Sequence, residues 1–165
     1  MSADPALLDG PLPPLGRGTR EEPRLTVESW MAVPGADGWQ LLLLRRTPAS
    51  GGFWQGCSGR VEAFDASLRA AALREIREET GLAEGVEIFD LGLWLEFRGP
   101  ISGAWFRKRS LAALLPTHVR EASVTLSDEH DAVELLPLDR ARERLRFRPC
   151  LDELDALERL LAARA

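Results

Sequence analysis

Apolar residues occur along this chain in short blocks separated by turns rich in glycine and proline. The blocks at 24–33, 39–46, 86–98, 104–115 and 132–136 have the length and the apolar content of strands. Leu41 to Leu44 form an unbroken apolar run, which is typical of a strand covered on both faces. The sequence therefore predicts several strands, the first two of which are joined by the turn at 34–38.

Three other segments have the pattern of helices. In the segment 149–163, leucines recur at helical spacing and form one apolar stripe. Residues 137–146 predict a shorter helix. A third helix is expected after Ser67, a suitable N-cap, and should end at Gly81, where the chain can turn left-handed. Strands mixed with helices in this order predict an α/β fold, an α/β/α sandwich with a mixed sheet.

The first 22 residues differ from the rest in composition. They contain four prolines and three glycines without any sustained period, so we expect a flexible or loosely docked arm at 1–22. Residues 23–165 are then expected to form one domain, the default for a chain of 165 residues.

The helix expected before Gly81 carries an unusual group of acids. At about 100° per residue, Glu75, Glu78 and Glu79 fall within an arc of roughly 100° on one face. Like charges at this spacing repel, which costs helix stability. A divalent cation such as Mg²⁺ or Mn²⁺ reverses that cost, because hard ions prefer carboxylate oxygens. The alternative interpretation is an ordinary solvated acidic face.

Composition narrows the function classes. Apolar residues make up 45% and charged residues 28%, as in ordinary globular proteins. The net charge of −5 argues against a protein that binds nucleic acid polymers. No apolar run is long enough to span a membrane, and the N-terminus lacks the pattern of a signal peptide. Cys57 and Cys150 are isolated, so we expect two reduced packing residues in a cytoplasmic protein. The oligomeric state is left open.

The stretch from Gly59 to Leu82 resembles the Nudix box, a motif in which a glycine, an acid, an Arg-Glu pair, a Glu-Glu pair and a final glycine keep a fixed register. Here these are Gly59, Asp65, Arg74-Glu75, Glu78-Glu79 and Gly81. Eight residues separate Asp65 from Arg74 where the family has seven, which indicates a one-residue insertion near 64–66. That insertion leaves open whether Asp65 supports Arg74, as the family's acid usually does.

The resemblance implies a fold, an activity and a set of site residues. Nudix hydrolases are metal-dependent pyrophosphohydrolases that act on a nucleoside diphosphate linked to another group. By analogy, Glu79, Glu75, Glu78 and the main-chain carbonyl of Ser58 would bind Mg²⁺ or Mn²⁺. Arg74 would hold the acids in place. A catalytically silent Nudix-fold module that binds a nucleotide or a protein is the alternative.

A weaker resemblance concerns the subfamily. Arg45-Arg46, Phe53-Trp54-Gln55 and Ser127-Asp128-Glu129-His130 resemble bacterial dihydroneopterin triphosphate pyrophosphatases. It implies that Glu129 binds metal, and either Glu129 or Glu75 is then the general base. Arg45, Arg46 and the side chain of Ser58 are candidates for binding a small phosphorylated substrate. An exposed loop acid and a solvated strand end are the alternatives for Glu129 and the arginines.

Overall fold

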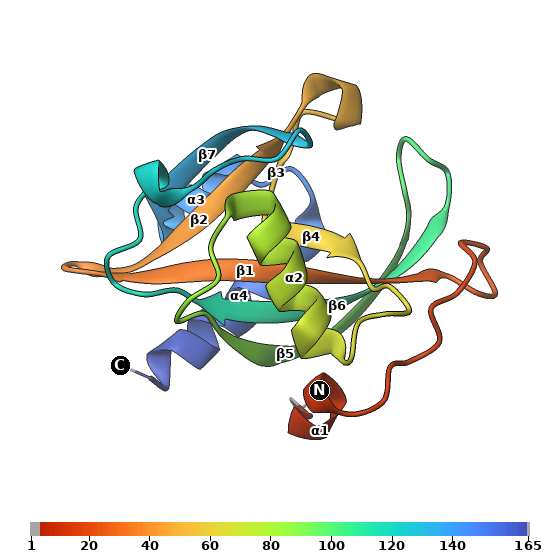
Figure 1. Cartoon of the computed structure of the whole chain (residues 1–165). Coiled ribbons are helices and arrows are strands. Elements are labelled where there is room, and N and C mark those ends of the chain that lie inside the picture. Colours follow the sequence, from red (N-terminus) through yellow and green to blue (C-terminus); the bar gives the residue numbers. More distant parts are fainter. Residues whose placement is uncertain (1–3, 165) are drawn as a thin grey trace.

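Seven strands form one mixed sheet in the computed structural model, which describes residues 4–164 (Figure 1). The strands are β1 Arg24–Gly35, β2 Gly38–Arg46, β3 Trp54–Gln55, β4 Cys57–Arg60, β5 Glu87–Arg98, β6 Trp105–Leu114 and β7 His130–Pro137. The α-helices are α1 Pro5–Asp9, α2 Leu68–Thr80, α3 Leu138–Arg144 and α4 Arg148–Ala162. Two single 3₁₀ turns, η1 Pro48–Ser50 and η2 Glu121–Ser123, complete the elements.

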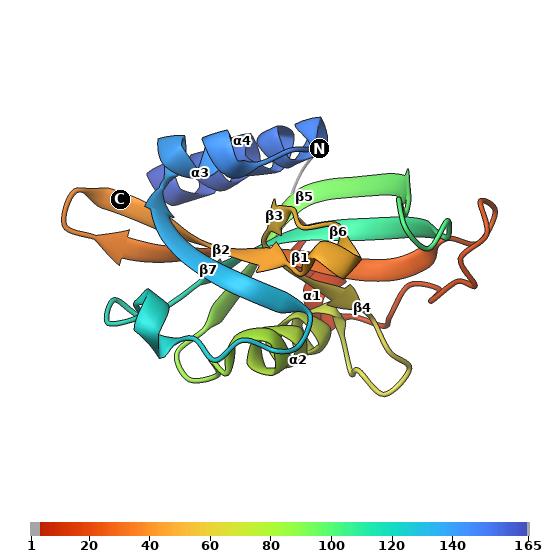
Figure 2. The same cartoon turned by 90° about the horizontal axis from the view of Figure 1, so that it is seen from above.

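Strand β1 is the centre of the sheet. The main order is β3-β2-β1-β6-β5, while β4 pairs with β1 and β7 with β2. Only the pairing of β1 with β6 is parallel; the other pairings are antiparallel. Helices α3 and α4 lie on one side of the sheet and α2 lies on the other (Figure 2). The predicted α/β/α sandwich with a mixed sheet is therefore confirmed.

Two apolar cores fill the spaces between the three layers. Alternate residues of β1 enter different cores: Val27 and Met31 pack on the α2 side, and Trp30 and Ala32 pack on the α4 side. The leucine run at 41–44 divides in the same way, so its interpretation as a strand covered on both faces is confirmed.

The ends of α2 follow the sequence signals. The Ser67 hydroxyl accepts a hydrogen bond from the Ala70 backbone N–H at 3.1 Å, and Gly81 has a φ of 74°. Ile76 and Ala72 turn into the core beneath the helix. This packing fixes the rotation of α2, and with it the direction in which its acids point.

The N-terminal arm is docked on the domain. Over the described residues 4–22 it packs against the domain: Leu8 is only 2% exposed and belongs to the core beneath α2. Asp9 pairs with Arg69 of α2 at 2.7 Å, and the Asp4 backbone N–H donates to Asp90. Of the two alternatives, a flexible or a loosely docked arm, these contacts favour a docked one, because leucines without a sustained period can still cover the edge of a core. Residues 1–3 lie outside the described residues.

Strands β3 and β4 had no clear signal in the sequence, since they are short and interrupted by glycine. Both cysteines are buried and free. Among the described residues, no helix is long and apolar enough to cross a membrane.

Candidate active site

The site is built where β4 passes beneath α2. A Cβ added at Gly59 would lie 2.0 Å from the carboxyl carbon of Glu75, so only glycine leaves room for that carboxylate against the strand. Glu75 itself is 8% exposed. The box glycine thus gives a helix carboxylate direct contact with the backbone of β4.

The main-chain carbonyls of β4 alternate in direction. The Val61 N–H donates to the Leu25 carbonyl of β1 at 3.0 Å, and in an antiparallel ladder every second residue makes such bonds. The carbonyls of Arg60 and Ser58 therefore point away from β1. The Arg60 carbonyl accepts from Arg74 of α2 at 2.9 Å, in agreement with this direction. By the same alternation, the Ser58 carbonyl points to the same edge of β4 as the Arg60 carbonyl.

Besides the Arg60 carbonyl, Arg74 contacts three carboxylates. It pairs with both oxygens of Asp65 at 2.8 Å, and its Nη1 reaches Glu75 at 2.8 Å and Glu78 at 3.2 Å. Asp65 therefore pairs with Arg74, although the inserted residue had made this pairing uncertain to predict from the sequence. The loop before α2 absorbs the insertion by placing Phe64 outward, 74% exposed, over the guanidinium of Arg74.

Glu79 is held by Ser127, which precedes β7, and by His130, the first residue of β7. Its Oε2 accepts from the Ser127 hydroxyl at 2.6 Å and lies 2.7 Å from His130 Nδ1. The other ring nitrogen of His130 lies 3.2 Å from the Gln55 side-chain nitrogen. Gln55 and Ser127 were not predicted to have a role; the only signal in the sequence was their place in two of the stretches that carry the weaker resemblance.

The acids influence one another's ionisation. Burial raises the pKa of Glu75 to about 7, although Arg74 opposes the shift. Burial and the neighbouring Glu79 raise the pKa of Glu129. Burial also disfavours charge on Glu79, but contacts with His130 and Ser127 leave its pKa below the usual value. The carboxylates therefore titrate as a group, and a divalent cation would favour their charged forms.

We refer to Glu75, Glu78, Glu79 and Glu129 as the site acids. With the Ser58 carbonyl they are the oxygen donors that Mg²⁺ and Mn²⁺ prefer, so the donor set fits a hard divalent cation. Within residues 4–164, no three acidic, imidazole or thiol groups already converge to hold an ion. Arg74, Ser127 and His130 occupy some of the oxygens, while the side chains of Glu78 and Glu129 remain 55% and 57% exposed.

The two candidate substrate arginines have different surroundings. Arg45 pairs with Asp131 at 2.7 Å and lies over the Trp54 ring. Arg46 approaches Glu129 at 4.0 Å, and its buried Nε has no partner in the structure. Of the two, Arg46 lies beside the site acids and keeps a donor free.

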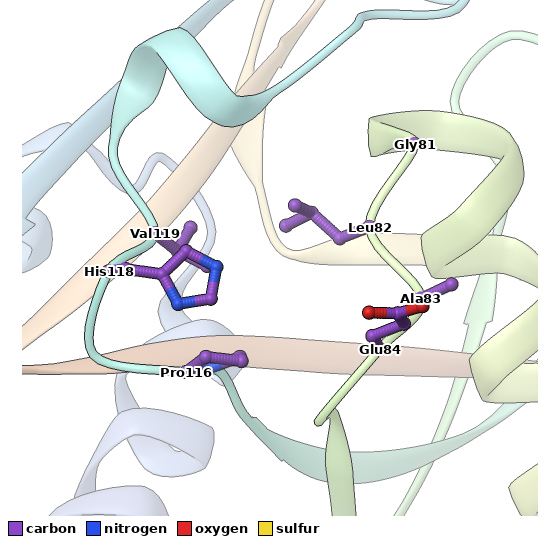
Figure 3. A pocket seen from close by; sticks show the side chains of 7 residues that line it. All are labelled: Gly81, Leu82, Ala83, Glu84, Pro116, His118 and Val119. Carbon is purple, nitrogen blue, oxygen red and sulfur yellow. The ribbon is translucent and has the colours of Figure 1, made fainter.

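A cavity of about 370 Å³ lies beyond the end of α2 (Figure 3). His118 and Glu84 face each other across it, and the site acids are not among its lining residues. It does not mark the site, because the acids lie on the α2–β4 contact and the segment before β7.

Comparison with known proteins identifies the family. A sequence model of the NUDIX domain matches residues 27–156. An octanoyltransferase from Myxococcus xanthus is 37% identical over 108 residues, which are 66% of this chain and 29% of that protein. The chain therefore spans less than a third of this curated relative.

Solved structures share the fold. A C. elegans Ap4A hydrolase superimposes with a TM-score of 0.72 at 21% identity, over 84% of this chain and 98% of that one. The E. coli dihydroneopterin triphosphate pyrophosphohydrolase gives 0.64 at 19% identity, over 84% and 95%. With the family match across most of the chain and the box glutamates on one helix, the chain belongs to the Nudix hydrolase family.

Proposed function

We propose that this protein is a divalent-metal-dependent pyrophosphohydrolase. It would cleave a phosphoric anhydride in a nucleoside-diphosphate-linked substrate or in a nucleoside or dihydroneopterin triphosphate. The observation that carries the proposal is the contact of the Glu75 carboxylate with Gly59, the residue that follows Ser58 on β4. It brings a helix acid against the strand that carries Ser58, while Glu79 on the same helix interacts with Glu129.

The residues of the site have the following roles in this proposal. Glu75, Glu78, Glu79, Glu129 and the Ser58 carbonyl would hold Mg²⁺ or Mn²⁺. When bound, such an ion neutralises phosphate charge and lowers the pKa of a coordinated water. Arg74 orients Glu75 and Glu78, while Ser127 and His130 orient Glu79.

Two acids are candidates for the general base. Glu75 has a pKa of about 7, which suits proton transfer near neutral pH. Glu129 also has a raised pKa, and it is the more exposed of the two. Glu75→Gln and Glu129→Gln distinguish them, because only loss of the base should remove the acidic limb of the pH–rate profile.

Arg46 is the better candidate for a phosphate contact. Its position near Glu129 supports this role, and the guanidinium suits phosphate geometry. Arg45 is proposed for a more distant part of the substrate, since its Nε is already used by Asp131. The Ser58 side chain, intermediate in exposure, remains a further candidate.

A substrate screen tests the proposal. Nucleoside triphosphates, dihydroneopterin triphosphate, ADP-ribose and dinucleoside polyphosphates would be incubated with Mg²⁺, with Mn²⁺ and with EDTA. We expect hydrolysis of at least one compound and its loss in EDTA. Binding of a nucleotide without turnover in either metal would instead favour the catalytically silent module.

A further inference from the structure

A second group of charges lies on the other side of the sheet, beneath α4. Lys108 of β6 pairs with Glu28 of β1 and, at 2.8 Å, with Glu153 of α4. The second oxygen of Glu153 accepts from the Trp30 indole N–H at 2.5 Å. We refer to Glu28, Trp30, Lys108 and Glu153 as the α4-side cluster. All four residues are buried.

The other carboxylate oxygen of Glu28 contacts a residue that lies next to the site. It accepts the Gly56 backbone N–H at 3.1 Å in a buried hydrogen bond. Gly56 comes immediately before β4, and a Cβ there would lie 2.7 Å from the Ser29 carbonyl, so the turn lies directly on β1. In the β1–β4 register Glu28 lies opposite Ser58. The Glu28 carboxylate thus holds the backbone immediately before β4, the strand that contains Ser58 and Gly59.

Stability does not explain why two carboxylates share one ammonium. Burial and repulsion from Glu28 raise the pKa of Glu153. Replacing a buried charge by an apolar side chain of similar volume is often neutral or stabilising when the remaining charges stay balanced. Removing either glutamate would leave one Lys and one Glu, a balanced pair. The second carboxylate therefore needs another explanation, and Glu28 alone has a contact with the metal-site strand.

We propose that Glu28 is a positioning residue of the site, which holds the segment from Gly56 to Gly59 so that the Ser58 carbonyl and the Glu75 carboxylate stay together. Lys108 holds the other oxygen of Glu28 from the α4 side of the sheet. The inference rests on the proposed function in one respect, the participation of Ser58 in metal binding.

The matched variants Glu28→Met and Glu153→Met separate positioning from general packing. Each leaves Lys108 in a balanced pair, but only Glu28→Met removes the acceptor of the Gly56 N–H. Glu28→Gln restores an acceptor oxygen without the charge. The measurements are the Mn²⁺ dissociation constant by calorimetry, the exchange rate of the Gly56 amide proton by NMR, and a melting curve for each protein.

We expect Glu28→Met to weaken Mn²⁺ binding about tenfold, the lower range for residues that support metal ligands, and to accelerate exchange at Gly56. Glu153→Met should keep the dissociation constant within about twofold, and Glu28→Gln should recover part of the loss. Equal affinities in wild type and Glu28→Met would overturn the inference and leave the proposed function intact. Equal losses in both Met variants would also overturn it, since they indicate general loosening. A wild-type protein that binds no Mn²⁺ contradicts both.

A second pair of variants covers the case in which Glu28→Met does not fold. Glu28→Met/Lys108→Met and Glu28→Gln/Lys108→Met both remove the charges of that ion pair and differ only in an acceptor for Gly56. Tighter Mn²⁺ binding by the variant with Gln supports the inference. Indistinguishable binding by the two contradicts it.

Discussion

The two charge groups on opposite faces of the sheet differ in how fully their oxygens are used. In the α4-side cluster, each of the four carboxylate oxygens of Glu28 and Glu153 has a donor from the protein. Among the site acids, the two partners of Glu79 share one oxygen, and Glu78 and Glu129 are half-exposed. A fully satisfied buried network fixes geometry, whereas partly satisfied acids keep the capacity to bind a ligand.

The largest expected effect on turnover comes from Glu79→Gln. This change keeps the size of the side chain but removes the charge that we propose binds metal. Turnover on the best substrate of the screen should fall at least a hundredfold, or about 2.7 kcal/mol in the barrier. The thermal midpoint should also fall, because the folded protein stabilises the charge of Glu79 through Ser127 and His130. Near-normal turnover at saturating Mg²⁺ would remove Glu79 from the metal site, and Glu153→Gln serves as the control acid from the other face.

Arg74→Met should destabilise the protein, because it removes the guanidinium that pairs with Asp65, Glu75 and Glu78. The change leaves the Asp65 carboxylate, 3% exposed, without its bidentate partner. Breaking a buried pair by removal of one member typically costs about 3 kcal/mol or more. Chemical denaturation would measure the loss, and Arg77→Met, on the same helix, is the control. A loss below about 0.5 kcal/mol would show that solvent or the Glu62 backbone N–H, which donates to Asp65 at 2.8 Å, compensates for the lost guanidinium.

Divalent metal should stabilise the protein through the site acids alone. Mn²⁺ at about 100 times its dissociation constant would add roughly 2.7 kcal/mol and raise the melting midpoint relative to EDTA. The rise should disappear in Glu75→Gln/Glu79→Gln and persist in Glu153→Met. Persistence of the full shift in the double glutamine variant would place the ion elsewhere.

Leu8→Ala tests whether the arm stabilises the α2 side. Leu8 belongs to the core beneath α2, so its truncation should cost about 2 kcal/mol, the low end for a buried leucine at an edge. Ile101→Ala, at an exposed turn, should cost less than about 0.5 kcal/mol. If both variants unfold like wild type, the arm has no part in holding α2.

The smallest effect concerns pH. The hydrogen bonds from Arg74 hold the pKa of Asp65 below its usual value. A carboxylate whose pKa is lower in the folded state stabilises the protein above its unfolded pKa, about 3.9, and this contribution is lost as the pH falls through the folded value. In the Asp65→Asn variant, the free energy of unfolding should therefore fall less steeply with decreasing pH below about pH 4. An unchanged slope in that range would mean that other carboxylates dominate acid unfolding.

Much of the fold could be predicted because its signals are local. The leucine run at 41–44, the Ser67 cap and the left-handed Gly81 depend on residues close in the chain, and the structure has each where the sequence indicated. The arm could not be predicted in this way. Its leucines have no period, and only the edge of the core beneath α2 gives them a surface to cover.

The sequence by itself determined the family, the order of the main elements and the grouping of three glutamates on one face of α2. Those features follow from spacing along a single helix or strand, which the chain fixes locally. Only the tertiary structure decided the partners of each acid. Asp65 meets Arg74 despite the inserted residue, Glu79 meets His130 from a strand 51 positions later, and Glu28 reaches Gly56 across the β1–β4 pair. Contacts of this kind depend on how α2, β1, β4 and β7 pack together, and no periodicity within one element records that packing.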